Sequence, residues 1–520
     1  MRFRQSFMVK LLAVFLLWLF LAAIVYWRTE SNFLRAESGW YLCLSHSPPD
    51  LQQRFMKLWA TSSYNGHYTP VAFISEFVTA RFVGTRAPFW KWRQITVVAL
   101  LATILSGLTS DFGRLLGLSP PKRVLSAAAL TALFVFQPGM TDFIAWPFLI
   151  FQLLWLLLTF VALASLMKTV ERPDSASWPW LAIGAAYGSL NFVGLGLTTV
   201  GATAAVLAGL LSWEYRTARS KKLVMPLVTL LIVSALHAFL MLILPRVEGT
   251  LQIDRSPHFL SAAFGFVSNF AVAALRTLIS AYPSTLQATE LQADWPYGVA
   301  LIVILVMAAS AIAFQALRSQ QSTPAQRGSF VLAAFGTVCF IALVILISTR
   351  EITHPSPNGF GNYLIGQRYL VPGGFALLGL AVLLFVRANA VPFAVCAVVN
   401  LVLVLSAITG NAQFRRNVYP NVEPKSVISH DRAWQSIVTM ASQCQKAGLP
   451  IPNLPLGALT QEFGDWDLKL FEPLLRADLN VAAETSLEFI PWQQISGEPA
   501  ERYAKDIPAL REAKENLKLR

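Results

Sequence analysis

Charged residues are scarce in this chain of 520 residues, because Asp, Glu, Lys and Arg together make up only 13%. A soluble domain of this length carries about 25%, and 55% of the residues here are hydrophobic. With a mean hydropathy of +0.53, this composition excludes a soluble enzyme of ordinary make-up and a disordered chain. It favours a polytopic membrane protein.

Cysteine and the familiar catalytic signatures are also scarce. The four cysteines, Cys43, Cys339, Cys396 and Cys444, form no CxxC pair, so there is no zinc or thiol-redox signature. No HExxH, Walker A, GxGxxG or GxSxG pattern occurs in a credible context. The chemistry of the chain must therefore be sought in other polar residues.

Long apolar runs, in contrast, are abundant. A membrane-spanning helix needs about 20 predominantly apolar residues. The sequence contains eleven such candidates, at about 9–27, 94–110, 124–139, 145–167, 178–195, 197–213, 223–245, 296–317, 328–348, 369–386 and 391–409. The first is interpreted as an uncleaved anchor, because it is too long for a signal peptide and is followed by Trp27 and Arg28.

The formal net charge is +13. We interpret the basic residues as topology anchors and as contacts to lipid headgroups, so the expected partners are membrane lipids and not nucleic acid. Basic residues gather in alternate loops, which the positive-inside rule places inside, together with the N-terminus. These loops contain Arg114, Lys122 and Arg123; Lys168 and Arg172; Arg216, Arg219, Lys221 and Lys222; Arg318 and Arg327; and Arg387. We therefore expect the active face to lie outside.

The predicted fold is an all-α polytopic membrane protein of about 11 transmembrane helices. Residues 1–409 form the transmembrane domain, with a long first outer loop at 28–93, and residues 410–520 form a small C-terminal extramembrane appendage. The segment 258–282 is apolar but contains Arg276, which favours an interfacial or re-entrant helix. If it spans instead, the tail changes sides.

The first loop contains the acid nearest the end of the first span, Glu37, and a turn-rich NGHYTP stretch with His67 and Tyr68. A carboxylate at the membrane surface is a candidate general base. The alternative is that Glu37 pairs with Arg35 or with a headgroup. An apolar segment of helical spacing follows, from Val71.

Further polar residues stand at the predicted outer ends of later spans. Asp142 follows the turn at Pro138, and it either lines a site or caps the next helix. Asn191 is either a polar contact or a satisfied helix-end group. Arg368, followed by Tyr369, is either a phosphate ligand or a snorkelling interfacial residue.

His237 lies within an apolar run and is interpreted as a packing residue.

Four segments together resemble the GT-C superfamily of integral-membrane glycosyltransferases, which use polyprenyl-phosphate-linked sugars. They are AESGW in the first loop, GHYTP before a helix, ALFVFQPGMTDFIAWPF between the third and fourth spans, and GQRYL before a late span. The likeness covers the first 215 residues best and leaves the tail out. The chain departs from the family where a second acid would follow Glu37 and where Gln137 replaces a histidine.

The resemblance implies transfer of a sugar from a polyprenyl-phosphate donor to a glycan, lipid or protein acceptor, on the outer face of a bacterial inner membrane. Glu37 would be the base of an inverting single displacement, and Arg368 would stabilise the departing phosphate. His67, Tyr68, Asp142, Asn191 and Tyr369 would bind substrate. No metal site is assigned, although Glu37 and Asp142 would suit a divalent cation.

Three other readings stay open. A transporter or flippase of lipid-linked glycan would need charged or broken helices near the bilayer midplane, whereas the polar residues here cluster at the outer ends. A non-catalytic membrane scaffold is favoured by the missing second acid. A polysaccharide ligase or polymerase would differ only in its chemistry.

Overall fold

The computed structural model describes residues 2–29, 41, 49–63, 68–84, 87–137, 139–214, 220–245, 323–353 and 393–413, with single residues between 303 and 314. Throughout these residues the regular secondary structure is helical, and they contain no strand. The predicted all-α class is confirmed for this part of the chain.

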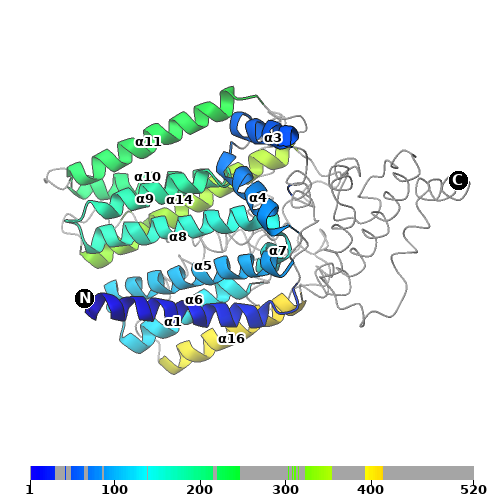
Figure 1. Ribbon diagram of the computed structural model, residues 1–520. Coiled ribbons are helices and arrows are strands. Elements are labelled where there is room, and N and C mark those ends of the chain that lie inside the picture. The colour runs from blue at the N-terminus through cyan, green and yellow to red at the C-terminus, as the bar shows by residue number, and fades with distance from the viewer. Residues whose placement is uncertain are drawn as a thin grey trace, which may run out of the picture.

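Nine helices run side by side as a bundle (Figure 1). In the described residues they are α1 (Arg2–Val25), α5 (Ala87–Leu115), α6 (Pro120–Phe136), α8 (Ile150–Glu171), α9 (Ser177–Leu190), α10 (Gly196–Glu214), α11 (Ser220–Ile243), α14 (Pro324–Thr353) and α16 (Phe393–Gln413). They lie over nine of the eleven predicted runs. The other two, 296–317 and 369–386, lie outside the described residues, except for single helical residues in the former.

Shorter helices gather at one end of this bundle. They are α3 (Pro49–Thr61), α4 (Pro70–Val83), α7 (Met140–Ala145) and the 3₁₀ turn η1 (Pro147–Leu149) (Figure 1). We call this the first-loop end, because α3 and α4 belong to the loop 28–93. The opposite end is where α8 and α10 finish and where α11 and α14 begin.

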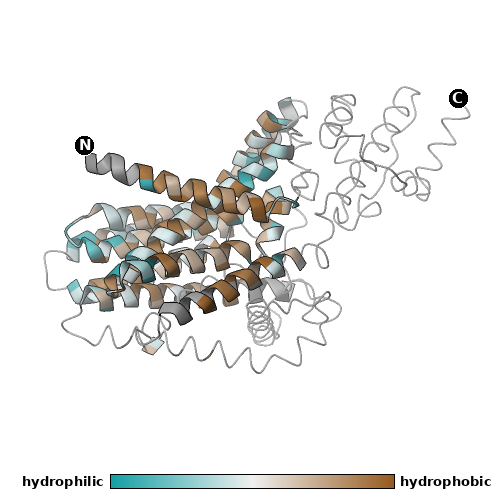
Figure 2. Cartoon of the chain, turned by 90° about the horizontal axis from the view of Figure 1, so that it is seen from below, coloured by the Kyte–Doolittle hydropathy of each residue, from teal (hydrophilic) through white to brown (hydrophobic). Residues whose placement is uncertain are grey.

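Five helical segments are long and apolar enough to cross a membrane: Pro88–Leu115, Pro147–Glu171, Gly196–Glu214, Ser220–Ile243 and Pro324–Leu346. A shorter apolar helix covers Val9–Val25. Figure 2 shows hydrophobic residues along the lengths of the helices and hydrophilic residues toward their ends. The chain is therefore a helical membrane protein, whereas the total of eleven spans stays a prediction.

Helix α11 has one buried face and one exposed apolar face. Its buried residues form one stripe at intervals of three and four, which is a single face of a helix: Leu223, Pro226, Leu230, Ser234 and His237. The other face exposes large apolar side chains such as Met225, Ile232 and Leu242. An exposed apolar face of this length is unfavourable in water and neutral in hydrocarbon.

Interhelical contacts within the bundle combine close packing with polar bonds. The rings of Phe134 and Phe160 pack edge to face at 5.4 Å. Trp155 Nε1 donates to Thr199 Oγ1 at 3.0 Å, and the Thr159 and Thr199 hydroxyls are 2.7 Å apart, joining α8 to α10. Because lipid tails are as apolar as leucine, packing and such bonds, rather than hydrophobic burial, hold spans together.

The fourth predicted span begins later than expected. The run at 145–167 was predicted to form it, with Asp142 as a candidate cap, but Asp142 lies in the separate helix α7, and α8 begins only at Ile150. Trp146 has φ −114° and ψ 101°, an extended conformation that the proline ring of Pro147 imposes on the preceding residue. The break separates α7 from the long helix.

The turn between α9 and α10 is longer than the apolar runs predicted. The run at 178–195 was expected to be helical throughout, but α9 ends at Leu190 and α10 starts at Gly196. A Cβ added at Gly196 would lie 2.4 Å from backbone atoms of Leu190. Only glycine fits this close approach.

Candidate functional site

A buried ion pair organises the first-loop end. Helix α4 buries the face that carries Phe73, Glu76, Phe77 and Ala80. The Arg93 guanidinium of α5 donates to Glu76 through Nη1 at 2.7 Å and Nη2 at 3.1 Å. The Glu76 side chain is 2% exposed and that of Arg93 15%. This bidentate geometry is the strong form of the contact.

Arg93 and the next residue also hold the segment that carries Asp142. Arg93 Nη2 donates to the Pro147 carbonyl at 2.9 Å. Gln94, which is fully buried, donates from Nε2 to the Phe143 carbonyl at 2.8 Å. Adjacent residues of α5 thus bind the backbone on both sides of Trp146, which fixes α7 and η1 against the bundle.

Asp142 lies in the first turn of α7 and is 7% exposed. The N-cap position of that helix is Gly139, and no side-chain cap bond is made there. The structure therefore excludes the capping role that the sequence had left open for Asp142. Its carbonyl accepts from the Trp146 amide at 3.0 Å, so the residue is held by the same short segment that Arg93 and Gln94 anchor.

Tyr68 and Asn191 belong to a second group at the same end, centred on His237. The Tyr68 hydroxyl donates to the Ala60 carbonyl at 3.1 Å, and its ring centroid is 5.4 Å from that of His237. The Tyr187 ring of α9 also contacts the His237 ring, with 6.1 Å between the ring centroids. Asn191 Nδ2 donates to the Tyr187 carbonyl at 3.0 Å. Tyr68 and Asn191 are thereby joined through His237 and Tyr187.

His237 is a buried packing residue, as the sequence predicted. It is 2% exposed. However, it lies near the end of α11, where Ser63 N binds the Pro245 carbonyl at 2.9 Å, and its Nε2 has no hydrogen-bond partner among the described residues. An unpaired buried nitrogen is costly, so its ring contacts must outweigh that cost.

Four of the predicted site residues lie outside the described residues. They are Glu37, His67, Arg368 and Tyr369. Tyr68, Asp142 and Asn191 are described, and all three lie at the first-loop end. Within the described part of the chain, no group of three or more His, Cys, Asp or Glu residues could hold a metal. The pairing of Glu37 with Asp142 around a cation stays a prediction.

Sequence reasoning missed Glu76, Arg93 and Gln94. A usable signal was present, because Glu76 shares a helical face with Phe73, Phe77 and Ala80, and a charge on an apolar face requires a partner. The partner itself, 17 residues further on, was not identifiable from spacing. Gln94 gave no comparable signal, since its partners are backbone carbonyls.

The opposite end of the bundle carries a different set of charges. Lys168 contacts Asp111 at 2.5 Å and Glu171 at 2.8 Å, and Arg114 contacts the same two acids at 3.2 Å and 2.8 Å. This half-buried network is balanced in charge. It belongs to the end that the positive-inside rule assigns to the inner face, away from the predicted site.

Comparison with protein families, with curated proteins and with solved structures finds no match for the chain. The class of the protein therefore rests on its fold, which is that of a helical membrane protein.

Proposed function

We propose that the chain is a membrane glycosyltransferase of the GT-C type, which moves a sugar from a polyprenyl-phosphate donor to an acceptor outside the membrane. One observation carries the proposal. Tyr68, Asp142 and Asn191, which are far apart in sequence, lie at the same end of the bundle as the helices of the first loop (Figure 1). An apolar bundle with polar groups at one end suits a substrate that has a lipid tail and a hydrophilic head.

The proposed reaction is a single displacement. The acceptor oxygen forms a bond to the anomeric carbon of the sugar as the bond from that carbon to the phosphate oxygen breaks. Glu37 takes the acceptor proton, and the lipid phosphate leaves with the electron pair. Arg368 stabilises its growing negative charge. The residues that position the substrate are His67, Tyr68, Asp142, Asn191 and Tyr369.

His237 enters this proposal as a positioning residue for Tyr68. Its ring packs against the Tyr68 ring at 5.4 Å, and its own burial keeps it away from substrate. Replacement with alanine removes that ring contact, whereas phenylalanine restores it without the unpaired nitrogen. We expect His237→Ala to raise KM with little change in kcat, and His237→Phe to return KM toward the wild-type value.

The deciding experiment is deletion of the gene in its host, followed by mass spectrometry of surface glycans and lipid-linked sugars. Deletion should remove one sugar from a glycan and cause the donor lipid to accumulate. Wild type should repair the defect, and Glu37→Gln should not, because general-base catalysis contributes about 10²–10⁴-fold. Asp50→Asn, which removes another acid of the first loop, is the matched control and should repair the defect fully.

Membrane levels of all variants are compared by immunoblot. If Glu37→Gln repairs the defect as well as wild type does, Glu37 is not the base and the proposed mechanism fails. If deletion changes no glycan and no lipid-linked sugar, the transferase assignment itself fails.

A further inference from the structure

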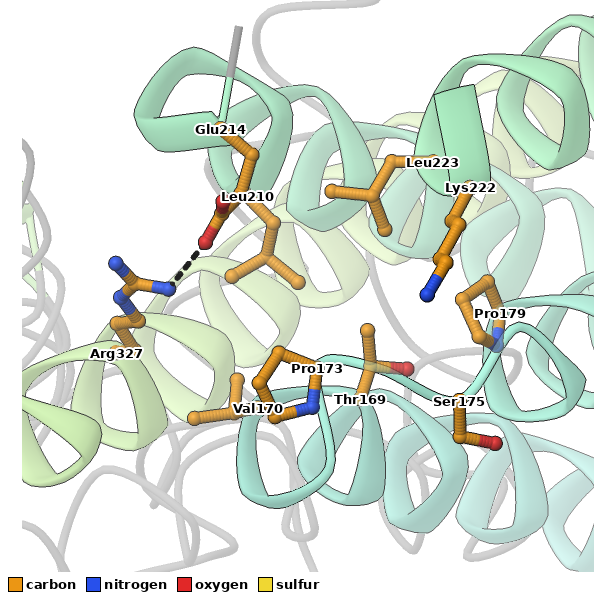
Figure 3. Close-up of a pocket in the computed structure, with 10 residues that line it drawn as sticks. All are labelled: Thr169, Val170, Pro173, Ser175, Pro179, Leu210, Glu214, Lys222, Leu223 and Arg327. Carbon is orange, nitrogen blue, oxygen red and sulfur yellow. Dashed lines mark hydrogen bonds and ion pairs between the residues drawn. The ribbon is translucent and has the colours of Figure 1, made fainter. Parts of the chain in front are cut away.

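An open hollow lies at the end of the bundle opposite the predicted site. It lies where α8, α10, α11 and α14 end or begin (Figure 3). Its lining includes the charged residues Glu214, Lys222 and Arg327 and the apolar residues Val170, Leu210 and Leu223. Neither the sequence motifs nor the proposed transferase reaction assigns a role to this hollow.

The two cations that line the hollow differ in their partners. Arg327 is neutralised by Glu214, with Nη1 and Oε1 2.6 Å apart, and its guanidinium carbon lies 5.7 Å from the Trp213 ring centroid. Lys222, on the other side of the hollow (Figure 3), donates from Nζ to the Asp174 carbonyl at 2.5 Å. No carboxylate among the described residues forms an ion pair with Lys222.

An ammonium group has three N–H donors, and a backbone carbonyl satisfies one of them without cancelling the charge. Lys168, at the same end of the bundle, is paired with two carboxylates. The position of Lys222 adds to the positive potential, because it lies in the first turn of the 24-residue helix α11. Amide groups at a helix N-terminus favour an anion. Among the described residues that line the hollow, Lys222 is therefore the cation that forms no ion pair with a carboxylate.

The rest of the lining is apolar. Leu210, Val170 and Leu223 lie between the two charged walls (Figure 3). The outward face of α11 beside the hollow exposes Met225 and Val228, as a lipid-facing helix would. A phosphate joined to an apolar group matches this combination of one cation and an apolar floor, whereas a free phosphate would use only the cation.

We propose that the hollow binds the phosphate group of an anionic phospholipid, with Lys222 as its counter-ion and the apolar floor under the glycerol and the first acyl carbons. The location agrees with the bilayer, since headgroups lie where the apolar spans α8, α10 and α11 end. This inference is independent of the transferase proposal, because it uses no residue of that site.

The test uses the full-length protein purified in a mild detergent. In the first experiment, dioleoyl phosphatidylglycerol or dioleoyl phosphatidylcholine is titrated, and native mass spectrometry counts the bound lipid molecules. In the second, the thermal unfolding midpoint is measured with phosphatidylglycerol, with glycerol 3-phosphate and with inorganic phosphate. Lys222→Gln should weaken phosphatidylglycerol binding by about fivefold or more, the effect of one lysine near an anionic surface. Lys222→Arg should retain binding, and Lys221→Gln, which removes an exposed charge one residue away, should leave it unchanged.

If Lys222→Gln does not fold, Ser175→Asp replaces it, because a carboxylate in the hollow should repel the phosphate. Ala176→Asp is its control, because Ala176 is an exposed residue of the same loop. Equal losses for Lys221→Gln and Lys222→Gln would indicate diffuse charge and overturn the site. Equal binding of phosphatidylcholine, or equal protection by glycerol 3-phosphate or inorganic phosphate, would overturn the assignment to an anionic lipid.

Discussion

At the scale of single residues, the first-loop end depends on one buried ion pair. Glu76 and Arg93 form a bidentate pair, and Arg93 also packs over the Trp90 ring, with its guanidinium carbon 4.6 Å from the centroid. Removing one member of such a pair leaves the other buried and unpaired, whereas removing both takes away the desolvation cost as well. The pair therefore links the first-loop helix α4 to α5 more firmly than a surface ion pair would.

We predict that Glu76→Gln lowers the free energy of unfolding by about 3 kcal/mol, the lower end of the range for breaking a buried pair. Thermal unfolding of the purified protein in detergent measures it. The double variant Glu76→Leu with Arg93→Met should lie closer to wild type than Glu76→Gln does. Arg81 lies on the same helix as Glu76 and contacts Gln52 of α3 at an exposed position, so Arg81→Gln should change stability by less than about 1 kcal/mol. Equal effects of Glu76→Gln and Arg81→Gln would show that the buried ion pair contributes no more to the free energy of unfolding than the exposed contact does.

At the scale of elements, α10 and α14 approach most closely at Gly209. A Cβ there would lie 2.1 Å from Cζ of Phe330, which itself packs edge to face on Trp213 with 5.0 Å between ring centroids. The ring cannot move without disturbing Trp213 and the Arg327 above it. Glycine at this position lets the backbone of one span approach the aromatic ring of another.

Gly209→Ala should destabilise the protein by about 1–3 kcal/mol, the usual cost of overpacking. Gly107→Ala is the matched control, because its Cβ would meet nothing within 4 Å; alanine there should be neutral or stabilising by up to about 1 kcal/mol. Unfolding midpoints of both variants give the comparison. Adding Phe330→Leu to Gly209→Ala should recover part of the loss, and no recovery would place the strain elsewhere.

At the scale of the whole molecule, the bundle helices from α1 to α11 alternate in direction, so their connections alternate between the two ends of the bundle (Figure 1). Lys57 of α3 is at the first-loop end and Ser177 of α9 is at the opposite end, and both are exposed. Three helices, α5, α6 and α8, separate them in sequence. An odd number of crossings puts the two positions on opposite sides of a membrane.

We predict that a cysteine at position 57 reacts with a membrane-impermeant maleimide in intact cells, and that a cysteine at position 177 reacts only after permeabilisation. The background replaces Cys43, Cys396 and Cys444 with serine and retains Cys339, which is buried. Labelling of both positions from one side would mean that one of the three helices does not cross. The reverse pattern would place the first loop inside and contradict the predicted orientation.

The positions of most helices were predictable from sequence. A segment that spans a membrane must satisfy its own backbone hydrogen bonds, and it therefore forms a helix wherever about 20 apolar residues occur. The break before α8 was also predictable, because Pro147 disfavours a helical conformation of the residue that precedes it. The helical spacing from Val71 predicted α4, whose buried face does carry Phe73 and Phe77. Glu37, His67, Arg368 and Tyr369 remain sequence-based predictions.

What the sequence by itself determined is the class of protein, the position of most helices and the concentration of polar residues at their ends, since these follow from local composition. Only the tertiary structure decided which polar residues meet. Glu76 finds Arg93, and His237 finds Tyr68 across 169 positions. Lys222 faces a hollow built from four other segments. Such contacts depend on how helices pack, and packing is decided by side-chain shapes summed over the whole bundle rather than by any local pattern.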